Sequence, residues 1–334
     1  MYYVERQAQL QHWIEGHLQR APLALETASA DASFRRYFRV RCDDRSLIAM
    51  DAPPPQEDCR PFVKVARLMA DAGLHVPEVV AADLERGFLL LTDLGSSGYL
   101  PALNADSADR LFGDATDALV RWQLASKPGV LPPYDEALLR RELELFPEWY
   151  LQRHLGLAAG AAQRRMLDGV FAAILQSNLA QPVVYVHRDF MPRNLMVCAP
   201  NPGILDFQDA VFGPITYDVV SLFKDAFISW DEERVLDWTV RYWEKAKRAG
   251  LPVDADFGAF YRDFEWMGLQ RHLKVLGIFA RLHYRDGKHG YLDDTPRFIA
   301  YVRAVAARYG ALAPLLALLD EIEGKAGASV GYTF

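Results

Sequence analysis

The 334-residue chain is poor in cysteine and has no long hydrophobic run. Its three cysteines, Cys42, Cys59 and Cys198, are far apart and form no C-x-x-C pair, which argues against a disulfide framework and a zinc site. The longest apolar stretch, 311–319, contains Pro314 and falls short of the ~20 residues of a membrane-spanning helix. We interpret it as a core helix and expect a protein of the reducing cytoplasm.

The chain also lacks an excess of positive charge, because 37 Lys and Arg residues are outnumbered by 44 Asp and Glu residues, for a formal net charge of −7. There is no basic stripe that could neutralise the phosphates of a duplex, so nucleic acid is not an expected partner. Glu5, Arg6, Glu15 and Arg20 interrupt any apolar run long enough for a signal peptide. These features predict no membrane partner and a cytoplasmic location.

The chain does have enough hydrophobic residues, 51%, to bury a core, and it exceeds the ~250–300 residues at which one core tends to divide into two. Residues 1–95 are predicted to form a β-rich lobe. Strand patterns on either side of a polar turn at 42–44 indicate a hairpin, and Gly73 follows an amphipathic helix as a C-cap residue would. The expected strands are 35–41, 45–51, 79–84 and 87–92, and the expected helix is 58–72.

Residues 96–334 are predicted to form a larger, mostly helical lobe, which makes the fold class α+β. The tail after Gly324 has no apolar period, and we expect it to be frayed. Short β-type runs at 183–186, 195–197 and 203–205 interrupt the helical pattern. The expected helices are 106–125, 161–179, 231–248, 257–282 and 295–319.

The chemistry concentrates in this interruption. His187 to Asn194 has the form H-x-D-x-x-x-x-N between two strand-like runs, and Asp206 ends the next one. In phosphoryl transfer from ATP, an aspartate accepts the proton of the acceptor hydroxyl, while an asparagine and a second aspartate hold Mg²⁺ against the phosphates. Asp189, Asn194 and Asp206 fit these roles in that order.

Each of these residues alone has an ordinary structural explanation. Asp189 could cap a backbone amide, Asn194 and Asp206 could form turns, and His187 could be a core histidine. Together, the right residue types follow one another in a strand, loop, strand, turn and strand context, behind a β-rich region and ahead of helices. The combination favours a kinase.

Three segments, His187–Asn194, Asp206–Asp209 and Gly213–Asp218, resemble the active-site region of the aminoglycoside phosphotransferase and choline kinase superfamily. The resemblance implies a protein-kinase-like, two-lobe fold. Over nearly the full length, the chain is similar to the branch that phosphorylates N-acetylmuramate and N-acetylglucosamine at the anomeric hydroxyl in peptidoglycan recycling. The segments that carry this closer likeness are 29–40, 48–55, 145–151 and 270–282.

The resemblance implies roles for individual residues. Asp189 would be the catalytic base, Asn194 and Asp206 the magnesium ligands, and Asp218 a structural residue that opens a helix as an N-cap and braces the catalytic loop. Asp209 would be a further metal or substrate contact, or part of a solvated turn. The hinge Thr92, Asp93 and Leu94 would contact adenine through its backbone.

The chain departs from the kinase pattern where phosphate is bound. Met50 occupies the strand position of the usual lysine, and the first hairpin has no G-x-G-x-x-G. Gln208 replaces the glycine of the D-F-G element and no A-P-E follows, which argues for a small-molecule kinase without a phosphorylated activation loop. The candidates for phosphate contacts are backbone amides of the first hairpin, Ser33, Arg35 or Arg36, and Lys64.

The acceptor pocket is less defined. An anomeric hydroxyl is acidic enough for a carboxylate base, and the lactyl carboxylate of muramic acid needs a cation. Arg271, His272 and Lys274 cluster on one predicted helix and are candidates, although a solvated helix face would have the same composition. We assign a substrate role to Glu148, and packing roles to its neighbours Trp149 and Tyr150.

The leading hypothesis is therefore a monomeric, ATP- and Mg²⁺-dependent amino-sugar 1-kinase. One alternative is a kinase of another small alcohol, such as an aminoglycoside, choline or homoserine. A second alternative is a pseudokinase that binds nucleotide without transfer, suggested by Met50 and the missing glycine-rich loop.

Overall fold

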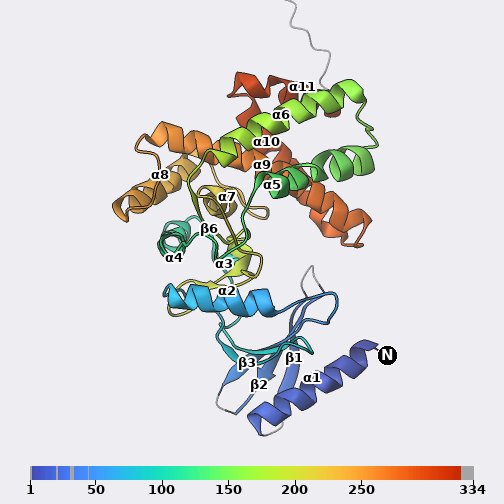
Figure 1. Ribbon diagram of the computed structural model, residues 1–334, viewed down its shortest axis with the longest axis vertical. Helices are drawn as coiled ribbons and strands as arrows, with labels where there is room; N and C mark the ends of the chain where they lie inside the picture. The colour runs from blue at the N-terminus through green and yellow to red at the C-terminus, as the bar shows by residue number, and fades with distance from the viewer. Residues whose placement is uncertain (1, 20–21, 31–33, 44, 325–334) are drawn as a thin grey trace, which may run out of the picture. The chain divides into compact units, whose positions relative to one another are not determined.

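The computed structural model describes residues 2–19, 22–30, 34–43 and 45–324, which cluster into two compact units (Figure 1). The N-terminal unit contains the described residues of 1–125 together with 192–210, and the C-terminal unit contains those of 126–191 and 211–334. Both units are thus assembled from separate segments, whereas the lobes expected at 1–95 and 96–334 have a single boundary. The assignment of nucleotide to one lobe and of substrate to the other stays a prediction.

The N-terminal unit is built on a five-stranded antiparallel sheet of order β1-β2-β3-β5-β4. The expected hairpin is confirmed, since β2 pairs with β3 and Cys42 N donates to Arg45 O at 2.8 Å in the turn. The strands are β1 (Ala24–Ala30), β2 (Arg36–Arg41), β3 (Ser46–Asp51), β4 (Val79–Asp83) and β5 (Phe88–Thr92).

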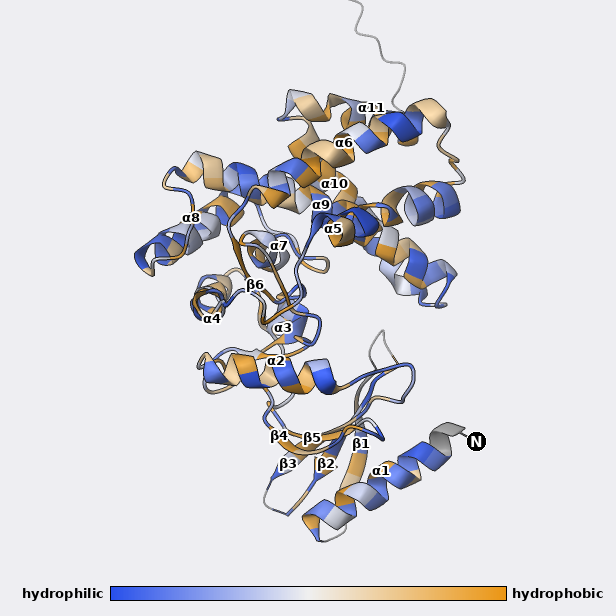
Figure 2. Ribbon diagram, viewed as in Figure 1, coloured by the Kyte–Doolittle hydropathy of each residue, from blue (hydrophilic) through white to orange (hydrophobic). Residues whose placement is uncertain are grey.

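Helices α1 (Tyr2–Leu18) and α2 (Arg60–Asp71) lie on opposite sides of this sheet (Figure 1). The sequence reading did not predict α1, which buries Leu10, Trp13 and Ile14 against apolar side chains of β2, β3 and β5. The prediction of α2 is confirmed. Hydrophobic and hydrophilic residues alternate along it (Figure 2), and Gly73 follows it with a φ of +75°.

The rest of the N-terminal unit carries part of the predicted motif. Helices α3 (Tyr99–Ala102) and α4 (Ala108–Leu124) are followed, after the chain returns, by the 3₁₀ turn η2 (Pro192–Asn194). Strands β7 (Leu195–Met196) and β8 (Gly203–Ile204) then pair as a short antiparallel ladder. This ladder places the residues after β8 beside η2.

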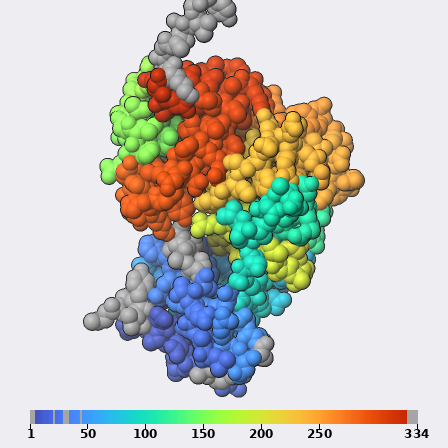
Figure 3. Space-filling model, turned by 180° about the vertical axis from the view of Figure 1, so that it is seen from behind, coloured from blue at the N-terminus to red at the C-terminus, as the bar shows by residue number. Residues whose placement is uncertain are grey.

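The C-terminal unit is mostly helical, with one small ladder between β6 (Val183–Val186) and β9 (Val211–Pro214). Helix α9 (Phe257–Tyr284) is its centre, because residues on all sides of this helix are buried. Helix α6, green, lies beside the red C-terminal helices (Figure 3). The other helices are α5 (Glu136–Leu143), the π-helical η1 (Phe146–His154), α6 (Ala161–Leu179), α7 (Tyr217–Phe223), α8 (Glu232–Arg248), η3 (His289–Asp294), α10 (Thr295–Ala306), η4 (Gly310–Leu312) and α11 (Ala313–Ile322).

One predicted helix is wrong. The segment expected as a single helix over 295–319 is broken into α10, η4 and α11. Pro314 lacks the amide hydrogen that an uninterrupted helix needs and clashes with the carbonyl four residues earlier, whereas it is well accommodated in the first turn of α11. The tail after Gly324 lies outside the described residues.

The sequence predicts neither a disulfide framework nor a membrane-spanning helix. All three cysteines are free. Within the described part of the chain, no helix is both long and apolar enough to span a bilayer.

Candidate active site

The loop that carries Asp189 leaves β6 and is fixed by Asp218. The carboxylate of Asp218 accepts hydrogen bonds from His187 N at 2.6 Å and from Arg188 N at 3.0 Å. The bracing role is confirmed, but the N-cap role is wrong, because Thr216 occupies the N-cap position of α7 and Asp218 lies inside the first turn. Burial raises the pKa of Asp218 to about 7 despite these two hydrogen bonds.

Asp189 itself is half-buried at the start of a tight turn. Its backbone N donates to His187 Nδ1 at 3.2 Å, and its carbonyl accepts from Met191 N at 2.9 Å. The backbone on both sides of Asp189 is therefore held by hydrogen bonds, as a general base that must be positioned requires.

Asn194 and Asp206 lie together in the N-terminal unit, so the three predicted residues are divided between the two units. Asn194 Nδ2 donates to Asp206 Oδ2 at 3.2 Å, and Asn194 O accepts from Leu205 N at 2.9 Å. Gln208 Nε2 donates to the other oxygen of Asp206 at 2.8 Å. The φ of Asp206 is +63°, a left-handed conformation that a non-glycine residue adopts at a cost and that clusters at functional sites.

The donor set of this pair suits Mg²⁺. Mg²⁺ binds oxygen, and proteins commonly hold it through one or two side chains while phosphate oxygens and water complete the coordination. Among the described residues, no group of three or more His, Cys, Asp or Glu side chains is arranged to bind a metal. Asn194 and Asp206 can therefore hold Mg²⁺ only together with a ligand such as the phosphates of ATP.

Arg35 is the cation beside this pair. Its Nη2 lies 3.9 Å from Asp206 Oδ1 and its Nε lies 4.0 Å from Glu57 Oε2. Arg36, the neighbouring candidate, instead pairs with the buried Asp51, which Arg6 also contacts at 2.5 Å.

The other positions considered for phosphate contacts are those of Met50, Lys64 and Ser33. Met50 is fully buried and has no charge to offer. Lys64 is exposed on α2, where it lines a shallow groove with Arg60 and Arg67. Ser33 lies outside the described residues.

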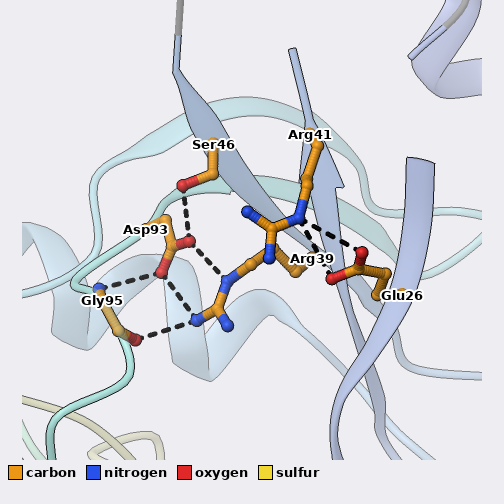
Figure 4. A network of polar contacts seen from close by, with 6 residues as sticks. All are labelled: Glu26, Arg39, Arg41, Ser46, Asp93 and Gly95. Carbon is orange, nitrogen blue, oxygen red and sulfur yellow. Dashed lines mark hydrogen bonds and ion pairs between the residues drawn. The ribbon is translucent and has the colours of Figure 1, made fainter. Parts of the chain in front are cut away.

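The predicted hinge is held by its own side chains (Figure 4). Asp93 accepts hydrogen bonds from Arg39 Nε and Ser46 Oγ, both at 2.7 Å, and from Gly95 N at 2.9 Å. Although burial opposes ionisation, these hydrogen bonds keep the pKa of Asp93 below its usual range. Thr92 ends β5 and its Oγ1 accepts from Glu78 N, while Leu94 packs close to Gly203. The side chain of Asp93 thus has a structural role, and the contact of this segment with adenine stays a prediction.

The basic cluster predicted on one helix is not a solvated face, since Arg271, His272 and Lys274 of α9 are all buried. Lys274 pairs with Glu142 at 3.0 Å and donates to Tyr217 Oη at 2.9 Å. Arg271 forms no ion pair with any described carboxylate, and its Nε has no hydrogen-bond partner. Burial opposes its charge, but Tyr217 and Asp189 outweigh burial and raise the pKa of Arg271.

The other substrate candidates are exposed. Glu148 lies on η1, where its negative charge acts on Arg281, and Asp209 accepts from Gln208 Nε2 at 3.5 Å. The packing role of Tyr150 is confirmed, because its ring is buried and stacks on Phe146 with centroids 5.7 Å apart. Trp149 is half-buried.

Several residues of the site were missed by sequence reasoning. Gln208 contacts Asp206, Glu57 contacts Arg35, and Glu142 contacts Arg188. Gln208 was noticed only as a missing glycine. Glu57 and Glu142 lie in segments that resemble ordinary charged helix termini, so nothing in their local pattern marks them.

Known proteins resemble this chain along nearly its whole length. An N-acetylmuramate/N-acetylglucosamine kinase of Pseudomonas putida is 57% identical over 305 residues, which cover 91% of this chain and 90% of that protein. A protein of the same name from Neisseria meningitidis is 48% identical over 336 residues, covering 99% of this chain and 100% of its own length.

Solved structures confirm the fold class. Choline kinase LicA from Streptococcus pneumoniae superposes with a TM-score of 0.65 at 13% identity, covering 91% of this chain and 100% of that one. The ADP-bound aminoglycoside phosphotransferase APH(2″)-Ib superposes with a TM-score of 0.57 at 14% identity, covering 88% of this chain and 97% of that one. The sequence profile described as the phosphotransferase enzyme family matches residues 24–255. The profile match over residues 24–255 and the identities of 48–57% to kinases over nearly the whole chain lead to one conclusion: the chain belongs to the phosphotransferase enzyme family.

Proposed function

We propose that this protein is an ATP- and Mg²⁺-dependent kinase that phosphorylates the anomeric hydroxyl of N-acetylmuramate and N-acetylglucosamine. The products would be the 1-phosphates of both amino sugars, formed in the cytoplasm by a monomer during cell-wall recycling. The observation that carries the proposal is the 57% and 48% identity, over nearly the whole chain, to proteins named for these two substrates.

Asp189 is proposed as the general base. Its carboxylate would accept the proton of the anomeric hydroxyl while the hydroxyl oxygen attacks the terminal phosphorus of ATP, the bond from that phosphorus to the bridging oxygen breaks, and ADP leaves. The support is local, since the backbone of Asp189 is fixed on both sides and His187 and Arg188 before it are held by Asp218.

Asn194, Asp206 and Arg35 are proposed to bind the phosphates of ATP. Asn194 and Asp206 would hold Mg²⁺, which supplies positive charge to the phosphate oxygens. Arg35, held between Glu57 and Asp206, would replace the strand lysine that Met50 cannot provide. The backbone of Thr92, Asp93 and Leu94 would contact adenine, with Ser33 and Lys64 as further candidates for phosphate contacts.

For the sugar, Arg271 is proposed to bind the lactyl carboxylate of N-acetylmuramate. It is a buried guanidinium without a described carboxylate partner, close enough to Asp189 for the two charges to interact. Glu148 is proposed to accept hydrogen bonds from sugar hydroxyls, and Asp209 to lie near the phosphates or the acceptor. Lys274 already contacts Glu142 and Tyr217, so any contact with substrate would be shared with them.

The test is a screen of sugars and other small alcohols with ATP and Mg²⁺, followed by ³¹P NMR of each product. We expect phosphate on the anomeric oxygen of both amino sugars. Phosphate on a different oxygen, or transfer to an aminoglycoside, choline or homoserine instead, would favour the first alternative.

Asp189→Asn separates catalysis from binding. We expect turnover to fall by about 10³-fold or more, because a general base contributes 10²–10⁴ and its neighbours act with it, while the affinity for ATP stays near wild type. Asp168→Asn, which changes a half-buried aspartate paired with Arg164 on α6, is the control and should retain wild-type turnover. A wild-type protein that binds ATP but transfers phosphate to no acceptor would support the pseudokinase alternative.

A further inference from the structure

Arg188, between His187 and the proposed base Asp189, has an unusual backbone. Its φ is +76°, in the left-handed region that non-glycine residues rarely adopt. Such a conformation persists only where the surroundings impose it. Here the backbone N of Arg188 donates to Asp218 Oδ1 at 3.0 Å, and its guanidinium Nη2 donates to Glu142 Oε1 at 2.5 Å.

Glu142 is placed to impose this conformation. It lies on α5, 46 positions before Arg188, and only 5% of it is exposed. Besides Arg188, its carboxylate contacts Lys274 Nζ and Gln270 Nε2 of α9, each at 3.0 Å, and it accepts a hydrogen bond from the hydroxyl of Tyr134. The carboxylate therefore connects the catalytic loop to α5, α9 and the segment before α5.

The charges make the contact strong. Although burial opposes ionisation, Lys274 and Arg188 lower the pKa of Glu142 to about 2, so the carboxylate is charged at neutral pH. The guanidinium of Arg188 also lies over the ring of Tyr134, 5.5 Å from its centroid. Removing the charge of Glu142 would leave the buried Lys274 and the partly buried Arg188 short of their shared anion.

In many kinases the active arrangement is produced by phosphorylation, because a phosphate on a mobile loop pairs with arginines and orders the site. In this chain a carboxylate of the fold itself meets the arginine next to the proposed base. We propose that Glu142 is a positioning residue, a permanent counter-charge that holds Arg188 and so keeps the loop in the conformation that presents Asp189, without phosphorylation. This inference rests on the proposed function only in taking Asp189 as the base.

The test compares steady-state kinetics of the full chain and three variants. Glu142→Gln keeps the shape and removes the charge, and we expect kcat to fall by about 10²-fold, as small misplacements of catalytic groups do, with the KM values changed by less than about threefold. Glu142→Asp keeps the charge and should retain more kcat than Glu142→Gln. The control is Glu144→Gln, two residues after Glu142, which removes an ion pair with Arg164. Its kcat should stay within about twofold of the wild-type value.

A double-mutant cycle distinguishes positioning from general destabilisation. If Glu142 acts through Arg188, the combined Glu142→Gln, Arg188→Gln protein should have the kcat of Arg188→Gln alone, because the interaction can be lost only once. The double variant removes both charges of the ion pair, so neither is left unpaired by the loss of the other. If Glu142→Gln alone fails to fold, the double variant and Glu142→Asp provide the test.

Two results would overturn the inference. One is a kcat for Glu142→Gln within twofold of wild type, or losses that multiply in the double variant. The other is a wild-type enzyme whose intact mass includes phosphate and whose kcat falls after phosphatase treatment. If the wild type transfers phosphate to no acceptor, the proposed function fails instead, which is a separate outcome.

Discussion

Asp218 shows how the surroundings of one carboxylate can make stability depend on pH. Its pKa is about 7 in the folded protein, above the ordinary value of 3.8. Because its pKa is raised in the folded state, the protonated Asp218 carboxyl makes its full contribution to the free energy of unfolding below about pH 4. That contribution is lost as the pH rises through about 7.

We therefore expect the ionisation of Asp218 to lower the free energy of unfolding of the wild type as the pH rises from about 4 to 8. Asp218→Asn does not titrate, so this part of the decrease should be absent, although the variant is less stable because its amide nitrogen cannot accept a backbone hydrogen bond. Urea unfolding across this pH range measures both effects. Parallel curves for the two proteins would contradict the assignment.

At the scale of single residues, the motif was readable from the sequence but its partners were not. Asp189, Asn194 and Asp206 stand out because their spacing is local. The sequence alone could not decide whether Arg35 or Arg36 is the better candidate for phosphate contacts, because the two arginines are adjacent. The decision depends on their partners Asp206 and Asp51, which lie in other segments.

At the scale of elements, the predicted hinge after β5 is held by a contact between Arg39 and Asp93. Arg39→Ala would leave the buried carboxylate of Asp93 short of its main partner, and we expect a loss of about 1–3 kcal/mol in the free energy of unfolding together with weaker ATP binding. Arg41→Ala is the matched control in the same strand, because its ion pair with Glu26 is about half exposed on both sides and is worth about 1 kcal/mol or less. Equal losses in the two variants would contradict a special role for the hinge contact.

The packing of α9 against the turn before η1 depends on Gly277. A Cβ there would lie 2.3 Å from the backbone carbon of Leu145, which cannot move aside as a flexible side chain would. We expect Gly277→Ala to destabilise the protein by about 1–3 kcal/mol, as overpacking does.

Gly169 offers the opposite case. It lies on an exposed side of α6 with no atom near its would-be Cβ, so Gly169→Ala should stabilise by about 0.5–1 kcal/mol through helix propensity. In thermal unfolding, Gly277→Ala should therefore lower the Tm and Gly169→Ala should raise it. Tm shifts of the same sign would show that the space around these glycines does not decide the outcome.

Elements were predicted best where one periodic face is buried. Helix α2 and strands β2 to β5 appeared close to their predicted positions for this reason, whereas β1 was not predicted. Helix α1 was missed although Leu10, Trp13 and Ile14 have helical spacing, because three apolar residues among many polar ones gain meaning only once the sheet they cover is known. The segment 295–319 was predicted as one helix because its apolar period continues through the break.

At the scale of the whole molecule, a net charge of −7 has to accommodate the polyanion ATP. Arg35 lies beside the Asn194 and Asp206 pair and is the cation proposed to meet the triphosphate, so Mg²⁺ would have to supply further positive charge. We expect EDTA to reduce transfer by about 10²-fold or more and Mg²⁺ to restore it, while the free energy of unfolding without ATP stays unchanged. Transfer that survives chelation would contradict the proposed role of the pair.

By itself, the sequence determined the fold class, the order of the motif residues and the departure at Met50, because these depend on local periodicity and spacing. The tertiary structure decided which charges meet: Glu142 with Arg188, Arg35 with Asp206, and Asp93 with Arg39. The physical reason is that an ion pair depends on distance in space, and these partners lie in different segments. The residue numbers of Glu142 and Arg188 differ by 46, and those of Arg39 and Asp93 differ by 54.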